Sequence, residues 1–329
     1  MSTRRQLLIA FGAGVLAQPL RSLAQPAKIP FVAYMTPVVP QNNTDPRLEA
    51  FVLGMRDLGY VPGKNLRLEV RWGEGRLERM PAIAAELVRL KPDVLVAASS
   101  PSILAARDAT RTIPIVMPVS SDPVGDGIVA SLARPGGNIT GLSTMAPELG
   151  AKRLQLLQEV LSGRSRAVGV IWNPAYKGMG ARFNEAKRAA PTLGVDLRSI
   201  EVRDPREMEA ALEAVSRNLP DGLLLLVDPF TLSMRARIVE FAREKSLPAI
   251  YETREFVEAG GLMSYGPNLD AQYRRAAYYV DRILKGARPG DLPIEQPAKI
   301  ELLVNLGTAR SLNLTVPSSI LLNANQVIN

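Results

Sequence analysis

Two aspartates, Asp122 and Asp228, are the side chains best placed for chemistry, because each directly precedes a proline at the end of an apolar run. Two carboxylates can act as acid and base without a histidine. The chain contains no histidine and no cysteine, which excludes Ser-His-Asp and Cys-His catalysis, histidine-ligated zinc, thiolate ligands and disulfides. What remains is carboxylate, lysine, tyrosine or serine chemistry, or binding without chemistry, so we expect no cofactor and no metal.

The elements that must position these residues are short apolar runs that alternate with helical stretches, which is typical of an α/β protein. The predicted strands span residues 29–35, 66–71, 93–98, 113–118, 139–143, 167–172, 196–202, 221–227, 247–251, 261–265 and 300–305. The predicted helices span residues 45–58, 77–90, 101–110, 124–133, 148–160, 179–193, 205–218, 231–245, 268–285 and 308–312. At 329 residues, with 47% hydrophobic and 22% charged side chains, the chain is expected to form about two domains.

The two halves of this pattern repeat one another. Six matched phrases occur in the same order; among them, Phe31–Pro37 parallels Val168–Pro174, and Pro92-Asp93 parallels Pro220-Asp221. Such an ordered repeat predicts two related, doubly wound lobes. We expect residues 28–141 with 266–290 in lobe 1 and residues 142–265 with 291–329 in lobe 2, so that three chain segments cross between the lobes.

Polar side chains follow many of these strands, at the edge where open parallel sheets collect ligands. In the first half they are Thr36, Ser99, Ser100, Ser120 and Asp122, and in the second half Asn173, Asp228, Tyr251 and its two successors. Serine, asparagine and aspartate are also favoured helix N-caps, and the prolines after Ser100 and Asp228 suit a first helical turn. The two roles are compatible, because a helix N-terminus presents free N–H groups to an anion.

Residues 1–24 have the features of an export signal. They open with Arg4-Arg5, continue through an apolar run from Leu7 to Ala17 that is too short to span a bilayer, and end in the small-residue site Ser22-Leu23-Ala24. Both the general secretory and the twin-arginine route fit this pattern. The formal net charge of +8 falls by three arginines when this segment is removed, and no basic run remains, so we expect no nucleic-acid binding.

Several longer phrases resemble those of a known family. They are Arg56–Tyr60, Asp122–Gly125, Ser131–Gly141, Gly260–Gly266 and Asp281–Gly286. With these phrases the chain resembles the exported substrate-binding proteins of bacterial ABC transporters, in a branch related to tryptophan- and tyrosine-binding proteins. The resemblance implies the type I periplasmic-binding-protein architecture, an α/β fold of two Rossmann-like lobes joined by a three-stranded hinge.

The resemblance also implies a site and a function. Position by position it points to Thr36, Ser99, Ser100, Ser120, Asp122, Asn173, Asp228, Tyr251 and Tyr265 as ligand-binding residues. For an amino-acid ligand, Asp122 or Asp228 would hold the ammonium group, and hydroxyls and backbone N–H groups the carboxylate. The implied protein is periplasmic and not an enzyme, and it delivers a small organic solute, such as an amino acid or an aromatic compound, to an inner-membrane ABC permease. We also expect a monomer, since lobe closure is easiest without a partner that blocks it.

Two alternatives from other classes stay open at this point. An exported enzyme on the same scaffold would use Asp122 and Asp228 as acid and base, although no motif of such an enzyme is present. A transcription regulator of related fold would need a DNA-binding head, which the first 28 residues do not contain.

Overall fold

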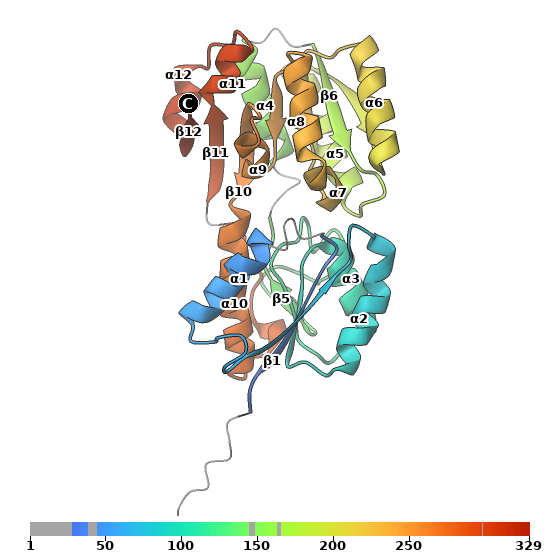
Figure 1. Cartoon of the computed structure of the whole chain (residues 1–329), viewed down its shortest axis with the longest axis vertical. Coiled ribbons are helices and arrows are strands. Elements are labelled where there is room, and N and C mark those ends of the chain that lie inside the picture. The colour runs from blue at the N-terminus through green and yellow to red at the C-terminus, as the bar shows by residue number, and fades with distance from the viewer. Residues whose placement is uncertain (1–27, 39–44, 145–148, 163–165, 298) are drawn as a thin grey trace, which may run out of the picture.

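The computed structural model describes residues 28–38, 45–144, 149–162, 166–297 and 299–329. These residues form two α/β lobes, one above the other in Figure 1. The predicted export signal lies outside the described residues. Within them, no helix combines the length and the apolar character needed to cross a membrane.

The first lobe is built on a five-stranded parallel sheet with the order β2-β1-β3-β4-β5. Its strands are β1 (Phe31–Thr36), β2 (Arg67–Trp72), β3 (Val94–Ala97), β4 (Ile115–Met117) and β5 (Ile139–Gly141). Alternate residues of β1 point to opposite faces: Val32 and Tyr34 pack under α1 (Pro46–Asp57) and α10 (Leu269–Leu284), while Ala33 and Met35 pack under α2 (Met80–Arg89) and α3 (Ser100–Ala109).

The second lobe is built on a seven-stranded sheet with the order β12-β11-β10-β9-β8-β6-β7, in which only the β10–β11 pair is antiparallel. Its strands are β6 (Ala167–Trp172), β7 (Asp196–Glu201), β8 (Gly222–Leu225), β9 (Ala249–Tyr251), β10 (Met263–Pro267), β11 (Ile300–Asn305) and β12 (Gln326–Ile328). Its helices are α4 (Gly150–Val160), α5 (Met179–Ala189), α6 (Pro205–Arg217), α7 (Pro229–Ser233), α8 (Arg235–Glu244), α9 (Arg254–Glu258), α11 (Leu306–Ser311) and α12 (Ser318–Asn323).

The internal repeat is confirmed by the order of the strands, since β2-β1-β3-β4-β5 in the first lobe corresponds to β7-β6-β8-β9-β10 in the second. One pair of side chains repeats with it. The Asp93 carboxylate accepts a hydrogen bond from Phe31 N at 2.8 Å, and the Asp221 carboxylate accepts from Ala167 N at 2.9 Å. In both lobes an aspartate before the third strand therefore binds the start of the first strand.

Hydrogen bonds join the segments that cross between the lobes. Ser143 N donates to Glu295 O at 2.8 Å, and Leu142 and Glu295 form a parallel bridge. The third segment leads from β10 into α10, and the Gln272 side chain of α10 donates to Ser143 O at 2.9 Å. The predicted fold class, two doubly wound α/β lobes joined by three segments, is confirmed.

One predicted helix was wrong. Residues 124–133 form a chain of turns, in which Asp126 N donates to Asp122 O and Gly127 N donates to Val124 O. Gly127 has φ 66°, a left-handed conformation that interrupts a right-handed helix. The predicted strands are all present, whereas β12, α9 and α12 were not anticipated.

Candidate functional site

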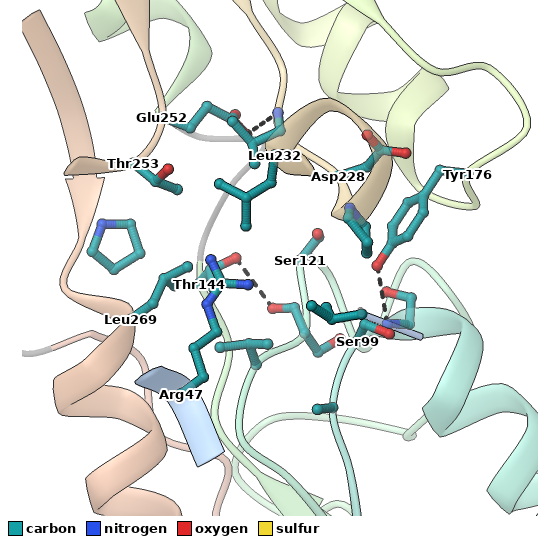
Figure 2. Close-up of a pocket in the computed structure, with 18 of the residues that line it drawn as sticks. Arg47, Ser99, Ser121, Thr144, Tyr176, Asp228, Leu232, Glu252, Thr253 and Leu269 are labelled. Atoms are coloured by element: carbon teal, nitrogen blue, oxygen red, sulfur yellow. Dashed lines mark hydrogen bonds between the residues drawn. The ribbon is translucent and has the colours of Figure 1, made fainter. Parts of the chain in front are cut away.

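A cleft lies between the two lobes and holds about 750 Å³ of space, part of it open to solvent (Figure 2). Its walls are the carboxyl ends of strands from both sheets, as expected for open parallel sheets. The first lobe contributes Thr36, Ser99, Ser100, Val119, Ser120 and Ser121, and the second lobe Tyr176, Val227, Asp228, Pro229, Glu252 and Thr253.

Five of the nine predicted ligand-binding residues line this cleft: Thr36, Ser99, Ser100, Ser120 and Asp228. All but Ser99 are almost completely buried. They come from β1, from the link between β3 and α3 including the first residue of that helix, and from the turns after β4 and β8. The structure thus brings strand ends that are far apart in sequence to one cavity.

Two predicted residues, Asp122 and Asn173, lie just outside the lining. The Asp122 carboxylate accepts a hydrogen bond from Gly125 N at 2.8 Å and so caps its own turn. The Asn173 amide donates to Asp228 Oδ2 at 2.7 Å, which fixes the carboxylate that does line the cleft.

The other two predicted residues, Tyr251 and Tyr265, also lie outside the lining. The Tyr251 ring is buried against Phe256 with the ring centroids 4.8 Å apart, on the helix-covered side of its sheet. Tyr265 reaches the site through its backbone, because its carbonyl accepts from Arg153 Nε at 2.7 Å.

Asp228 is both a helix cap and a wall of the cleft. Its Oδ1 accepts from Thr231 N at 2.8 Å, and the Thr231 hydroxyl accepts from Asp228 N at 2.9 Å, which completes a capping box on α7. Burial raises the pKa of Asp228, and the hydrogen bonds from Thr231 and Asn173 oppose that shift. The N-cap expected here is confirmed.

The N-terminus of α3 meets the second lobe directly. Ser100 N donates to the Tyr176 hydroxyl at 3.3 Å, across the cleft (Figure 2). Burial raises the pKa of Tyr176 to about 12, with the Asp228 charge adding to the shift, so the phenol stays protonated. Ser99 occupies the N-cap position without capping the helix, and its backbone has φ 92° and ψ 153°, a conformation normally confined to glycine.

A second contact between the lobes lies beside the cleft. Arg47 of α1, which lines the cavity, bonds Glu255 of α9 with 3.0 Å between Nη2 and Oε1. Burial favours the neutral form of Glu255, but the Arg47 charge and the hydrogen bonds to the carboxylate together outweigh it, so the pKa of Glu255 lies below its usual value. The two lobes are therefore held in contact at both Tyr176 and Arg47.

The sequence analysis missed a buried ion cluster in the second-lobe wall. Glu252 Oε1 accepts from Arg153 Nη1 at 2.7 Å, and Oε2 pairs with Arg182 Nη2 and also accepts from Val227 N. Burial lowers the pKa of both arginines. A signal was present, because Arg153 stands three residues before Leu156, within the apolar stripe of α4.

The described lining combines these charges with hydroxyl and apolar groups. Leu269 and Thr253 lie at one end of the cavity in Figure 2, and Tyr176, Asp228 and Ser99 lie at the other. Among the described residues, no group of three or more potential ligands could hold a metal ion. Such a lining can enclose a small molecule that carries both polar and apolar parts.

Comparisons with known proteins agree with this architecture. A family model described as "ABC transporter substrate binding protein" matches residues 34–328. The chain is 25% identical over 277 residues to a tyrosine-binding protein of Clostridioides difficile strain R20291, an alignment that covers 84% of this chain and 79% of that protein.

Two solved structures are similar over most of the chain. A conserved domain protein from Vibrio cholerae O1 biovar El Tor superposes with a TM-score of 0.85 and 28% identity, over 91% of this chain and 100% of that one. A Streptococcus pneumoniae ABC domain in complex with L-Trp superposes with a TM-score of 0.82 and 22% identity, over 91% of this chain and 99% of that one.

Proposed function

Because the chain belongs to the ABC transporter substrate-binding protein family, we propose that it is the solute receptor of an ABC importer. It captures a small organic ligand, an amino acid or an aromatic compound, in the cleft between its lobes. The lobes close by hinge motion, and the closed form docks on a permease in the inner membrane. The protein performs no chemistry and acts as a monomer.

One observation carries this proposal: the cleft is lined by both lobes, and each lobe contributes residues from strands that are far apart in sequence. A cavity divided between two bodies is enclosed only when they meet, so ligand binding and closure are coupled. The moving bodies would be residues 28–141 with 266–290, and residues 142–265 with 291–329.

The ligand class is supported by the tyrosine-binding relative and by the mixed lining of the cleft. An amino acid offers a carboxylate, an ammonium group and a side chain, for which the cleft provides arginines, Asp228 and the apolar residues Leu232 and Leu269. Thr36, Ser99, Ser100 and Ser120 would donate further hydrogen bonds.

Binding without catalysis fits the geometry better than the enzyme alternative. Asp228 lines the cleft, whereas Asp122 is outside the lining and bonded to its own turn. An acid and a base for hydrolysis would need to face the same substrate. The proposal also includes export, with residues 1–24 removed.

A thermal-shift screen tests the function. The purified protein is heated with amino acids, aromatic acids, dicarboxylates, amines and neutral sugars, each at about 100 times an expected dissociation constant, where a true ligand adds about 2.7 kcal/mol of stability. We expect one chemical class to raise the melting temperature. A protein that no solute stabilises, or one that converts a solute, would contradict the proposal.

Export is tested separately by fractionating cells and sequencing the mature N-terminus. We expect periplasmic protein that begins at or close to Gln25. Full-length protein in the cytoplasm would contradict this part of the proposal and leave solute binding untouched.

A further inference from the structure

The arginines of the second-lobe wall outnumber the carboxylate they share. Arg153 and Arg182 are 1% and 5% exposed, Glu252 is 4% exposed, and all three line the cleft. Each Glu252 oxygen is already bonded to one of the two guanidinium groups. One positive charge is therefore in excess within a buried cluster, which is costly unless a further anion compensates it.

The nearest other acids do not supply this anion by direct contact. The Asp228 oxygens are bonded to Thr231 N and to the Asn173 amide, and Asp126 accepts from the Ser100 hydroxyl at 3.5 Å. Within the described part of the chain, Glu252 is the sole carboxylate that forms an ion pair with Arg182.

Two donors in the lining have no acceptor. Arg182 Nε and Ser120 Oγ are buried and have no hydrogen-bond partner among the described residues. Both residues line the cavity, Arg182 on the second lobe and Ser120 on the first. An N–H or O–H left unpaired in a buried site destabilises the protein, and an anionic ligand in the cleft would offer acceptors to such groups.

We propose that the Arg153–Arg182 wall is a carboxylate subsite, and that the solute carried by this protein bears a carboxylate group. This inference rests on the proposed function and narrows its ligand class: neutral sugars and simple amines are excluded, whereas amino acids and aromatic acids are retained. In this arrangement the arginines of the second lobe bind the ligand's carboxylate through their charge, and the hydroxyl groups of the first lobe donate uncharged hydrogen bonds to it.

The distinct roles of the two arginines make the proposal testable. Arg153 also donates to the Tyr265 carbonyl and keeps Glu252 paired when Arg182 is replaced. Arg182→Met therefore removes the excess charge while one ion pair remains. Arg188→Met is the matched control, since Arg188 lies on the same helix, α5, with its side chain 71% exposed.

The experiment is calorimetric titration with three matched pairs of compounds and a sugar. The pairs are L-tyrosine and tyramine, L-leucine and isoamylamine, and benzoate and benzyl alcohol, and the sugar is D-glucose. We expect binding by at least one carboxylate and none by its matched partner. Arg182→Met should weaken that binding by about 10- to 150-fold, the value of one charge-assisted hydrogen bond, and Arg188→Met should leave it unchanged.

The melting temperature of the ligand-free variants separates a binding role from a structural one. We expect Arg182→Met to melt within about 3 °C of the parent protein or above it. A much larger loss in Arg182→Met, with the uncharged Arg182→Gln melting like the parent and binding the carboxylate like it, would overturn the subsite. So would the absence of binding by every carboxylate: if a sugar or amine binds instead, the receptor function stands and the subsite falls, and if nothing binds, both fall.

Discussion

Replacing Glu255 by glutamine should loosen the contact between the lobes beside the cleft. In the structure, where the two lobes touch, Arg47 and Glu255 are 3.0 Å apart, with side chains 15% and 28% exposed. When the lobes separate, both side chains return to water. The substitution therefore weakens the arrangement in which the lobes touch, which we take as the closed form, and has little effect on an open one.

The size of the effect follows from this geometry. Hydrogen bonds to charged groups contribute about 1.5–3 kcal/mol net, and the residual exposure of Glu255 favours the lower half of that range. The ratio of closed to open molecules should fall by roughly 10- to 50-fold. Because a ligand enclosed by both lobes requires the closed form, its apparent affinity can fall by up to the same factor.

Small-angle X-ray scattering of the ligand-free protein measures the opening directly, and titration measures the affinity. We expect Glu255→Gln to increase the radius of gyration and to weaken binding. Glu258→Gln is the control, because Glu258 lies on the same helix and pairs with Arg254 inside the second lobe. Unchanged scattering and affinity in Glu255→Gln, or equal changes in both variants, would refute the reasoning.

Three further predictions concern stability. Gly266→Ala should lower the free energy of unfolding, measured in urea, by at least the roughly 1–3 kcal/mol that overpacking usually costs, because the added Cβ would lie 2.0 Å from Glu252 O. Ser99→Gly should raise the melting temperature by relieving strain of about 1–3 kcal/mol, less the flexibility that glycine adds to the unfolded chain. The hydrogen bond from Ala167 N, followed by that from Arg166 N, lowers the pKa of Asp221 in the folded protein. The carboxylate therefore stabilises the fold fully above the pKa of the unfolded chain, and this contribution is lost as the pH falls through the folded pKa. In Asp221→Asn the free energy of unfolding should fall less steeply with acidification than in the parent protein.

The fold was predictable because short apolar runs in the local sequence indicate the strands, and the ordered repeat of these runs indicates two similar lobes. Pro92-Asp93 and Pro220-Asp221 recur since each aspartate binds a strand start in its own lobe. The short elements α9, α12 and β12 escaped prediction because five or six residues, or three, give too little periodicity. A helix was wrongly predicted at residues 124–133 from an apolar pattern. The segment forms turns instead, and these depend on the left-handed backbone of Gly127.

The candidate site was only partly predictable. Strand-end position identified Thr36, Ser120 and Asp228, but it could not distinguish Tyr251 from the next residue, Glu252. Adjacent residues at a strand end point to opposite sides, so one lies in the helix-covered core and the other in the cleft. The ion pair between Arg153 and Glu252 joins residues 99 positions apart in the sequence. Such a pairing cannot be predicted until the fold brings the two segments together.

The hydrogen bonds between the crossing segments limit how the lobes can move. Since Ser143, Glu295 and Gln272 join all three segments, independent twisting of one connection would break a bond, whereas bending all three together would not. Closure would then be a single bending motion of the three segments together, and one distance between the lobes would describe it. The chain has no cysteine, so two introduced cysteines, one on each lobe, would carry a fluorophore pair whose energy transfer reads that distance molecule by molecule.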